Sequence, residues 1–140
     1  MKKLFTLIMA AVFSSGAFAH NDPWKKEQVM STKELADRIN SKKDVPVILN
    51  IGPMENIKTA ITVGPMNSIF AKDKIQNALT GTDKSKEIVV YCGCCSYANC
   101  PNIRPAFEKV QELGYKKVKV LEIPEGIKPD WVAKGYPMEQ

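Results

Sequence analysis

Apolar residues along the chain gather in short runs that are separated by amphipathic or polar segments. Continuous apolar runs at 45–51, 88–91 and 118–121 predict strands, and a weaker run at 60–63 predicts a short one. Strands that are apolar on both faces are typical of a parallel sheet covered by helices. The runs therefore predict a small sheet that is buried on both sides.

Three segments, one before the first of these strands and two between later ones, have apolar residues at helical spacing. The first begins at Ser31, which stands three residues before Glu34 as in a capping box. The second covers 68–79, and the third ends at Gly114, a residue type common at helix C-termini. The apolar positions of the three segments are Leu35, Ala36 and Ile39; Ile69, Phe70, Ile75, Ala78 and Leu79; and Phe107, Val110 and Leu113. Alternating strands and helices predict a three-layer α/β domain with a small, mostly parallel sheet over residues 31–140.

The N-terminus has the pattern of a secretory signal peptide. Lys2 and Lys3 precede a short apolar run at 4–13, and a small-x-small cleavage site follows at 17–19. The run is too short to span a membrane. We therefore expect cleavage after Ala19 and a periplasmic or secreted protein without a membrane anchor.

Composition narrows the classes of partner. Removal of the two signal-peptide lysines lowers the formal net charge from +5 to +3, which favours small anionic partners and is no nucleic-acid signature. The only histidine, His20, would be the new N-terminus, and this excludes a Ser-His-Asp triad. Residues 20–30 are polar and unpatterned, so we expect a flexible lead-in there.

The cysteines are the candidate chemistry, because all four lie within nine residues at positions 92, 94, 95 and 100. Structural disulfides usually join distant segments, so this clustering indicates reactivity, metal binding or a local staple. Cys92 directly follows the strand at 88–91, and ligands gather at the carboxyl ends of parallel strands.

A helix start soon after Cys92 supports this view. Asn102 is a good N-cap residue, and it would place Pro105 in the first turn, where proline is tolerated. A helix N-terminus lowers the pKa of a nearby thiol and binds anions. We therefore predict that Cys92 is the catalytic nucleophile. The predicted substrate-binding residues are Gly93, Cys94, Cys95, Ser96 and Arg104.

Three segments together resemble a rhodanese-like domain. They are the strand running into Cys92, the helix that ends at 112–115 before a strand at 118–122, and the closing pattern from Trp131 to Gly135-Tyr136-Pro137. The resemblance implies that Cys92 accepts sulfane sulfur as a persulfide. It implies a sulfurtransferase that uses thiosulfate or polysulfide as donor, a thiol-bearing acceptor protein and no cofactor.

The chain departs from this family in three places. Cys92 and Gly114 are 22 residues apart, so the active loop is enlarged. Asn50 and Gly52 replace the usual Asp and Arg, and residues 60–64 replace the usual Gly-His-Ile-Pro-Gly-Ala. We interpret the last two changes as changes of scaffold, whereas the first bears on which substrate is bound.

Two other classes of function stay open. In a thiol–disulfide redox protein, Cys92 or Cys100 would exchange with a neighbouring cysteine, and Cys94, Cys95 or Cys100 could be the resolving thiol for Cys92. A disulfide from Cys94 or Cys95 to Cys100 would staple the enlarged loop. In a cysteine-rich module, the four thiols would bind Zn²⁺ or Cu(I). The spacing C-x-C-C-x4-C lacks the paired C-x2-C of common zinc sites, so we assign no metal ligand from the sequence.

Overall fold

A computed structural model describes residues 22–140, so the predicted signal peptide, its cleavage site and His20 lie outside the described residues. The described residues form one sheet of five parallel strands in the order β1-β5-β4-β2-β3. The strands are β1 (Val29–Ser31), β2 (Val47–Asn50), β3 (Ile61–Thr62), β4 (Ile88–Tyr91) and β5 (Val118–Glu122). All four strands predicted from apolar runs are therefore present, and the parallel sheet is confirmed.

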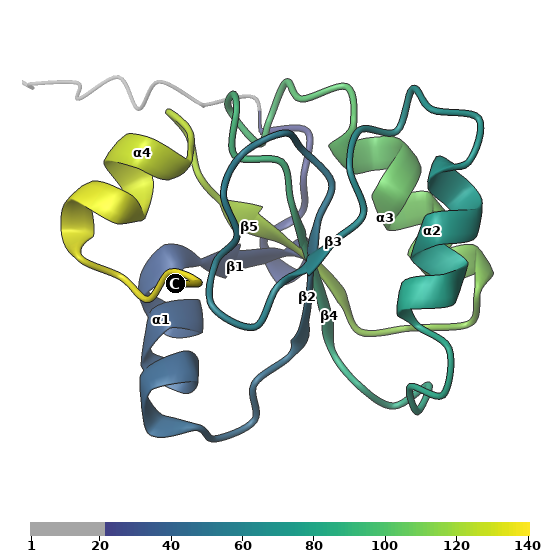
Figure 1. The fold of residues 1–140 in the computed structure, drawn as a ribbon, viewed down its shortest axis with the longest axis horizontal. Coiled ribbons are helices and arrows are strands. Elements are labelled where there is room, and N and C mark those ends of the chain that lie inside the picture. Colours follow the sequence, from purple (N-terminus) through teal and green to yellow (C-terminus); the bar gives the residue numbers. More distant parts are fainter. Residues whose placement is uncertain (1–21) are drawn as a thin grey trace, which may run out of the picture.

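Helices cover both faces of the sheet, which confirms the three-layer α/β architecture (Figure 1). α1 (Thr32–Ser41) and α4 (Ile127–Asp130) lie on one side, and α2 (Ala71–Ala78) and α3 (Ile103–Glu112) lie on the other. Short 3₁₀ helices occupy Lys26–Gln28 and Val132–Lys134. Within residues 22–140, none of the helices has the length and apolarity needed to cross a membrane.

Local signals at the helix ends act as the sequence predicts. The Ser31 hydroxyl accepts a hydrogen bond from the Glu34 amide at 3.1 Å and so caps α1. Gly114 ends α3 with a positive φ of 93°. Its amide donates to Gln111 and the next amide donates to Val110, which is the hydrogen-bond pattern of a Schellman cap. These two helix ends agree with the prediction because they depend only on neighbouring residues.

The start of the second helix was predicted wrongly. α2 begins at Ala71 instead of residue 68, and the preceding Ile69 and Phe70 are 85% and 61% exposed. The buried face consists of Ala71, Ile75 and Leu79, which repeat every four residues. Ile69 and Phe70 were counted as part of that face because they are apolar, although a turn precedes them and removes them from the helix.

Residues 22–30, the described part of the predicted flexible lead-in, are also more structured than their composition indicated. β1 pairs in parallel with β5 at the edge of the sheet, with Val29 opposite Val120. Trp24 is buried, and its ring lies 5.0 Å from that of Phe107 on α3. A three-residue edge strand is too short to show a hydrophobic period, so only its pairing with β5 reveals it.

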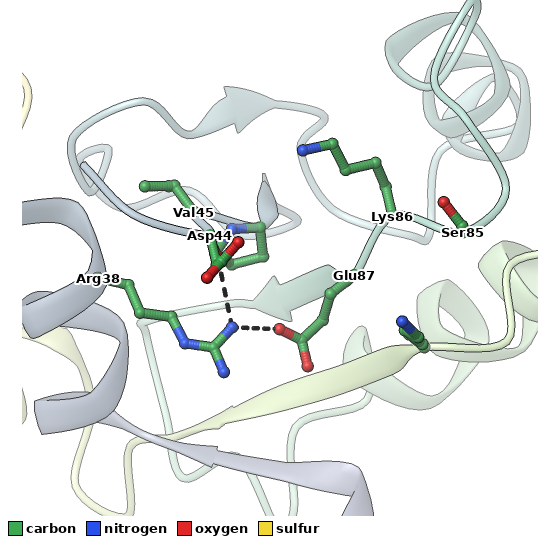
Figure 2. A pocket seen from close by; sticks show the side chains of 8 residues that line it. Arg38, Asp44, Val45, Ser85, Lys86 and Glu87 are labelled. Carbon is green, nitrogen blue, oxygen red and sulfur yellow. Dashed lines mark hydrogen bonds and ion pairs between the residues drawn. The ribbon is translucent and has the colours of Figure 1, made fainter. Parts of the chain in front are cut away.

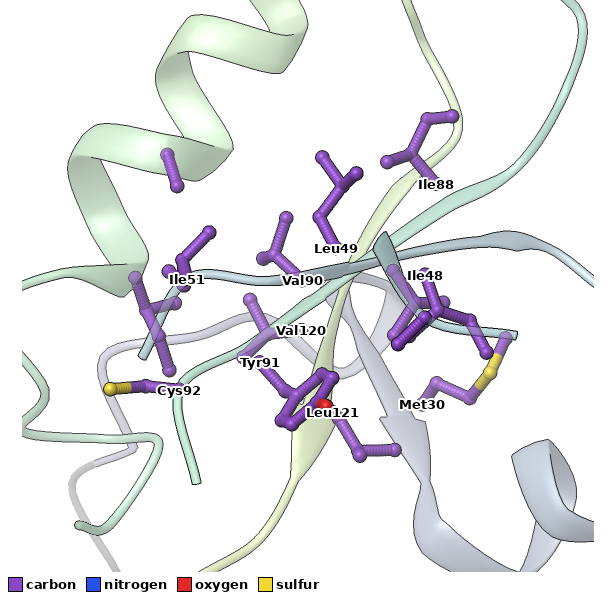
Figure 3. Close-up of a cluster of buried hydrophobic side chains, with 14 of the residues drawn as sticks. Met30, Ile48, Leu49, Ile51, Ile88, Val90, Tyr91, Cys92, Val120 and Leu121 are labelled. Atoms are coloured by element: carbon purple, nitrogen blue, oxygen red, sulfur yellow. The ribbon is translucent and has the colours of Figure 1, made fainter. Parts of the chain in front are cut away.

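The core lies at the centre of the sheet and extends to Cys92 (Figure 3). The Tyr91 hydroxyl accepts a hydrogen bond from the Ile57 amide at 2.9 Å, which ties the end of β4 to the loop after β2. The fully buried side chains of this core include Met30, Ile48, Leu49, Ile51, Ile88, Val90, Val120 and Leu121. The strand that leads to Cys92 is therefore rigidly held.

The C-terminal tail packs through Trp131, as expected of an anchor. Trp131 is fully buried, its indole N–H donates to the Pro137 carbonyl at 3.0 Å, and its ring meets Tyr136 edge-on at 5.2 Å. At the start of α4, the Ile127 amide donates to the Gly93 carbonyl at 2.9 Å. The tail thereby covers the segment that follows Cys92.

Candidate functional site: the cysteine loop

The segment from Cys92 to Asn102, here called the cysteine loop, joins the C-terminal end of β4 to α3. β4 is central in the sheet, between β5 and β2. Two hydrogen bonds fix the loop from outside: Gly93 accepts from α4, and the Tyr97 amide donates to the Ile123 carbonyl at 3.1 Å. The predicted site therefore lies where parallel α/β sheets usually bind ligands.

The loop brings its four sulfur atoms together. The Sγ atoms of Cys92 and Cys94 are 3.2 Å apart, those of Cys94 and Cys95 are 3.5 Å apart, and all four lie within 4.8 Å of one another. Cys92 and Cys100 are buried, Cys95 is half-buried and Cys94 is exposed. All four are free thiols in the structure, so disulfide pairing with Cys100 stays a prediction.

The surroundings of Cys92 stabilise its thiolate. A hydrogen bond from the Cys100 side chain lowers the pKa of Cys92 to about 5, against the opposing effect of burial, and Cys94 and Asn102 contribute further donors. Burial and donation to Cys92 raise the pKa of Cys94 to about 12, and donation to Cys92 together with burial raises the pKa of Cys100. The negative charge of the cluster thus resides on Cys92.

Asn102 has a different role from the one predicted. It precedes α3, as expected, but its side chain makes no capping hydrogen bond. Instead its Nδ2 group donates to Cys92 Sγ at 3.6 Å, and its Oδ1 atom accepts from the Met66 amide at 2.9 Å. Asn102 therefore connects the cluster to the loop before α2, a contact that sequence spacing could not reveal.

Gly52 was interpreted as a change of scaffold, yet it lies directly against Cys92, the predicted nucleophile. A Cβ atom at this position would stand 2.0 Å from the Cys92 carbonyl oxygen and 2.7 Å from Cys92 Sγ. The buried Asn50 side chain holds this backbone by accepting from the Gly52 amide at 3.0 Å. A signal was present in the sequence, because Gly52 follows the strand that neighbours β4.

The other predicted binding residues divide into buried and accessible ones. Gly93 is buried with φ of 81°, and a Cβ there would meet Ile127 and Met54 at 3.2 Å. Ser96 is half-buried, and its carbonyl accepts from the Asn99 amide at 3.1 Å, which closes a turn. These two residues shape the loop, whereas Cys94 and Cys95 present sulfur at its surface.

Arg104 lies in the first turn of α3 and is exposed. Its guanidinium stands 4.4 Å above the Trp24 ring and donates to the Pro23 carbonyl at 3.3 Å. The structure therefore places this cation against the N-terminal segment rather than against Cys92. A role in anion binding stays a prediction.

A shallow pocket of about 290 Å³ opens beside the cluster. Cys94 lines it, whereas the fully buried Cys92 does not. Lys128 on α4 also lines it, together with Met54, Gly93, Glu125, Gly126, Ile127 and Pro129. Lys128 supplies a cation near Cys94 that sequence reasoning missed, because 34 positions separate the two residues in the chain.

A larger pocket of about 490 Å³ lies at the opposite end of the sheet, before β2, β4 and β5 (Figure 2). Arg38 pairs there with Glu87 at 2.5 Å, and it also pairs with Glu34 at 2.5 Å. The lining residues are Arg38, Asp44, Val45, Pro46, Ser85, Lys86, Glu87 and Lys117. The described residues that line it include neither cysteine nor histidine, so none of the predicted site residues lies there.

Solved structures resemble the chain over most of its length. The rhodanese-like domain of the Anabaena sp. Alr3790 protein is 21% identical and has a TM-score of 0.57, with 81% of this chain and 79% of that chain covered. The BH2092 protein from Bacillus halodurans is 22% identical with a TM-score of 0.60, and the match covers 81% and 77% of the two chains.

A third structure is the complex of a cysteine-to-serine variant of EanB with hercynine. It is 19% identical with a TM-score of 0.57, and the match covers 81% of this chain but 28% of EanB. No family model and no curated protein matches the sequence. At these identities the likeness concerns the fold.

Proposed function

Because the chain has a rhodanese-like fold, we propose that it is a sulfurtransferase or sulfane-sulfur carrier that forms a persulfide on Cys92. One observation carries the proposal: the sulfur of Cys92, at the end of the central strand, contacts Cys94 Sγ at 3.2 Å and accepts from Asn102 Nδ2 at 3.6 Å. The pattern of residues 1–19 supports action in the periplasm or outside the cell.

The reaction with thiosulfate needs one nucleophile and one leaving group. The Cys92 thiolate attacks the sulfane sulfur, the sulfur–sulfur bond of thiosulfate breaks, and sulfite leaves with the bonding electron pair. A polysulfide donor loses a shorter polysulfide in the same way. The donors that stabilise the thiolate of Cys92 then stabilise the anionic persulfide. Transfer to a thiol of an acceptor protein restores the Cys92 thiolate.

Access to Cys92 depends on Cys94. Cys92 has no exposed surface, and the pocket beside it is lined by Cys94 and Lys128. An anionic donor is attracted by Lys128 and reaches Cys92 when the Cys94 side chain turns aside. Because the sulfur of the exposed Cys94 is joined to the backbone through one CH₂ group, rotation about the single χ1 bond accomplishes that movement.

The 3.2 Å contact between Cys92 and Cys94 also favours a second candidate, a thiol–disulfide reaction. Cys94 would attack Cys92 Sγ of the persulfide, form a Cys92–Cys94 disulfide and release hydrosulfide. Atoms and charge balance, because the terminal sulfur leaves with the electron pair of the persulfide bond. In that case the protein would release sulfide once and then require reduction.

Sulfite release tests the proposal. We expect metal-free, reduced protein to release one sulfite per chain from thiosulfate in a single turnover, and Cys92→Ser to release none. Asn99→Ala is the matched control, because Asn99 is an exposed residue of the same loop. Retention of sulfite release in a folded Cys92→Ser protein would overturn the assignment. Release of hydrosulfide without an added thiol would favour the second candidate.

A further inference from the structure

We propose that Cys92, Cys94, Cys95 and Cys100 form a tetrathiolate site for one Zn²⁺ ion. The site stands on geometry and is independent of the persulfide chemistry. One consequence, competition between the ion and sulfur loading for Cys92, rests on the proposed function. The argument proceeds from the positions of the sulfur atoms, the chemistry of the ligands and the rigidity of the loop.

The four sulfur atoms lie close to the separations that one ion requires. A tetrahedral site with zinc–sulfur bonds of about 2.3 Å has sulfur atoms about 3.8 Å apart. Two contacts in the cluster are 3.2 and 3.5 Å, and the largest separation is within 4.8 Å. Side-chain adjustments smaller than about 1 Å would therefore place all four sulfurs around one ion.

The ligand chemistry selects the ion. Among residues 22–140, the cluster contains four thiols and neither a carboxylate nor an imidazole. Hard ions such as Mg²⁺ and Ca²⁺ require oxygen ligands, whereas a tetrahedral set of four thiolates is typical of Zn²⁺. Four protein ligands leave no open coordination position, so the ion would not activate water. It would instead hold the four thiolates in place and block their reaction with other molecules.

The loop fold explains why the spacing in the sequence concealed this site. Common zinc motifs have pairs of cysteines with two residues between them, and this chain lacks that C-x2-C pairing. Here the turn closed by the Asn99 amide and the Ser96 carbonyl reverses the chain, and it returns Cys100 to the side of Cys95. Although four residues separate Cys95 from Cys100 in the sequence, their sulfur atoms lie within 4.8 Å of each other.

The surroundings hold the thiols in place without an ion. Backbone hydrogen bonds from Ile127 to Gly93 and from Tyr97 to Ile123 fix the loop. The side-chain Nδ2 group of Asn102 donates to Cys92 Sγ. A sulfur that accepts such an outer hydrogen bond is oriented toward the ion. The exposed Cys94, at the edge of the 290 Å³ pocket, gives the ion a path to the buried ligands.

Two titrations of the reduced full chain test the site. We expect competition against a chromophoric chelator to give one Zn²⁺ per chain, and Co²⁺ to give the intense visible bands of tetrahedral thiolate coordination. Cys95→Ser should lower zinc affinity by more than about tenfold. Mutation of a residue that only hydrogen-bonds to a metal ligand already costs about tenfold or more, and loss of a ligand should cost more than that. Asn99→Ala, in the same loop, should leave zinc affinity unchanged.

Three results would overturn the site: no zinc uptake, an octahedral Co²⁺ spectrum, or equal zinc affinity in Cys95→Ser and the parent chain. Uptake of Cu(I) without Zn²⁺ would also overturn it. The sulfur assay is run with chelator and the zinc assay without a sulfur donor, so each proposal can fail alone. With both established, saturating Zn²⁺ should suppress sulfur loading of Cys92, and unchanged loading would refute the competition.

Discussion

The two ends of the sheet each carry a pocket, and their contents differ. At the N-terminal ends of the strands, the 490 Å³ pocket holds Arg38, whose guanidinium already pairs with Glu34 and Glu87. At the C-terminal ends, the 290 Å³ pocket adjoins four thiols whose side chains, within residues 22–140, form hydrogen bonds only with one another and with Asn102.

The comparison shows that pocket volume does not locate the chemistry here. At the larger pocket, the charge of Arg38 is neutralised by Glu34 and Glu87, and these partly exposed pairs stabilise the fold modestly. Beside the smaller pocket, hydrogen bonds stabilise the thiolate of Cys92, the proposed nucleophile, and lower its pKa to about 5. A perturbed pKa beside an accessible hollow indicates function better than size does.

Among the variants that test this comparison, Gly52→Ala should cause the largest loss of stability and of sulfite release. The added methyl group would overlap the Cys92 backbone at 2.0 Å, and backbone cannot move aside cheaply. We expect sulfite release to be lost and the free energy of unfolding to fall by about 1–3 kcal/mol or more, measured by denaturant unfolding.

Gly81→Ala is the matched control for that variant. Gly81 also has a positive φ, of 78°, but a Cβ there would meet nothing within 4 Å. We expect a loss of stability near 1 kcal/mol and full sulfite release. Wild-type sulfur uptake in Gly52→Ala would show that the cysteine loop is not held as described.

Protonation of the Cys92 thiol gives a second test of the difference between the two ends of the sheet. Because its pKa is lowered from 9.0 to about 5, the thiolate should persist from neutral pH down to about pH 5 and be lost below it. The stability that this shift provides is complete above about pH 9 and decreases as the pH falls through about 5. The ultraviolet thiolate absorbance of metal-free protein, minus that of Cys92→Ser, measures the transition. A midpoint near 9 would contradict the described environment.

Asn102→Ala should have a smaller effect on the same titration. Loss of the donor to Cys92 Sγ removes one of several hydrogen bonds, so the pKa of Cys92 should rise by up to about one unit. Sulfite release at pH 6 should fall accordingly, while Asn99→Ala should not change it. An unshifted thiolate midpoint in Asn102→Ala would remove Asn102 from the site.

The smallest effect is expected at the opposite end of the sheet. Arg38→Met breaks the pairs with Glu34 and Glu87, which are partly exposed, and should cost about 1 kcal/mol of unfolding free energy or less. Sulfite release should be unchanged. A large loss of sulfur uptake in Arg38→Met would mean that the larger pocket takes part in the reaction.

The sequence predicts those parts of the molecule that depend on neighbouring residues. The buried strand at Ile88–Tyr91, the Ser31 cap and the Gly114 terminus all follow from local patterns, and all are present. β1 escaped prediction because it exists through pairing with β5, about 90 residues away. The start of α2 was misplaced because Ile69 and Phe70 are apolar yet exposed.

The site was predictable only in part, for the same physical reason. The position of Cys92 after a buried strand was visible in the sequence, and the structure places it at the end of β4. The contacts of Gly52 and Asn102 with Cys92 and the nearness of Lys128 arise from packing between distant segments. The convergence of four sulfurs depends on a turn that the spacing alone does not specify.

Peptide-level mass spectrometry of the metal-free chain, before and after incubation with thiosulfate or polysulfide, tests the central claim most directly. The account predicts one added sulfur atom on the peptide that contains Cys92, absent from Cys92→Ser and removed by a thiol acceptor. An unchanged mass in folded, reduced protein, or added sulfur that remains in Cys92→Ser, would contradict the assignment of Cys92 as the sulfur carrier.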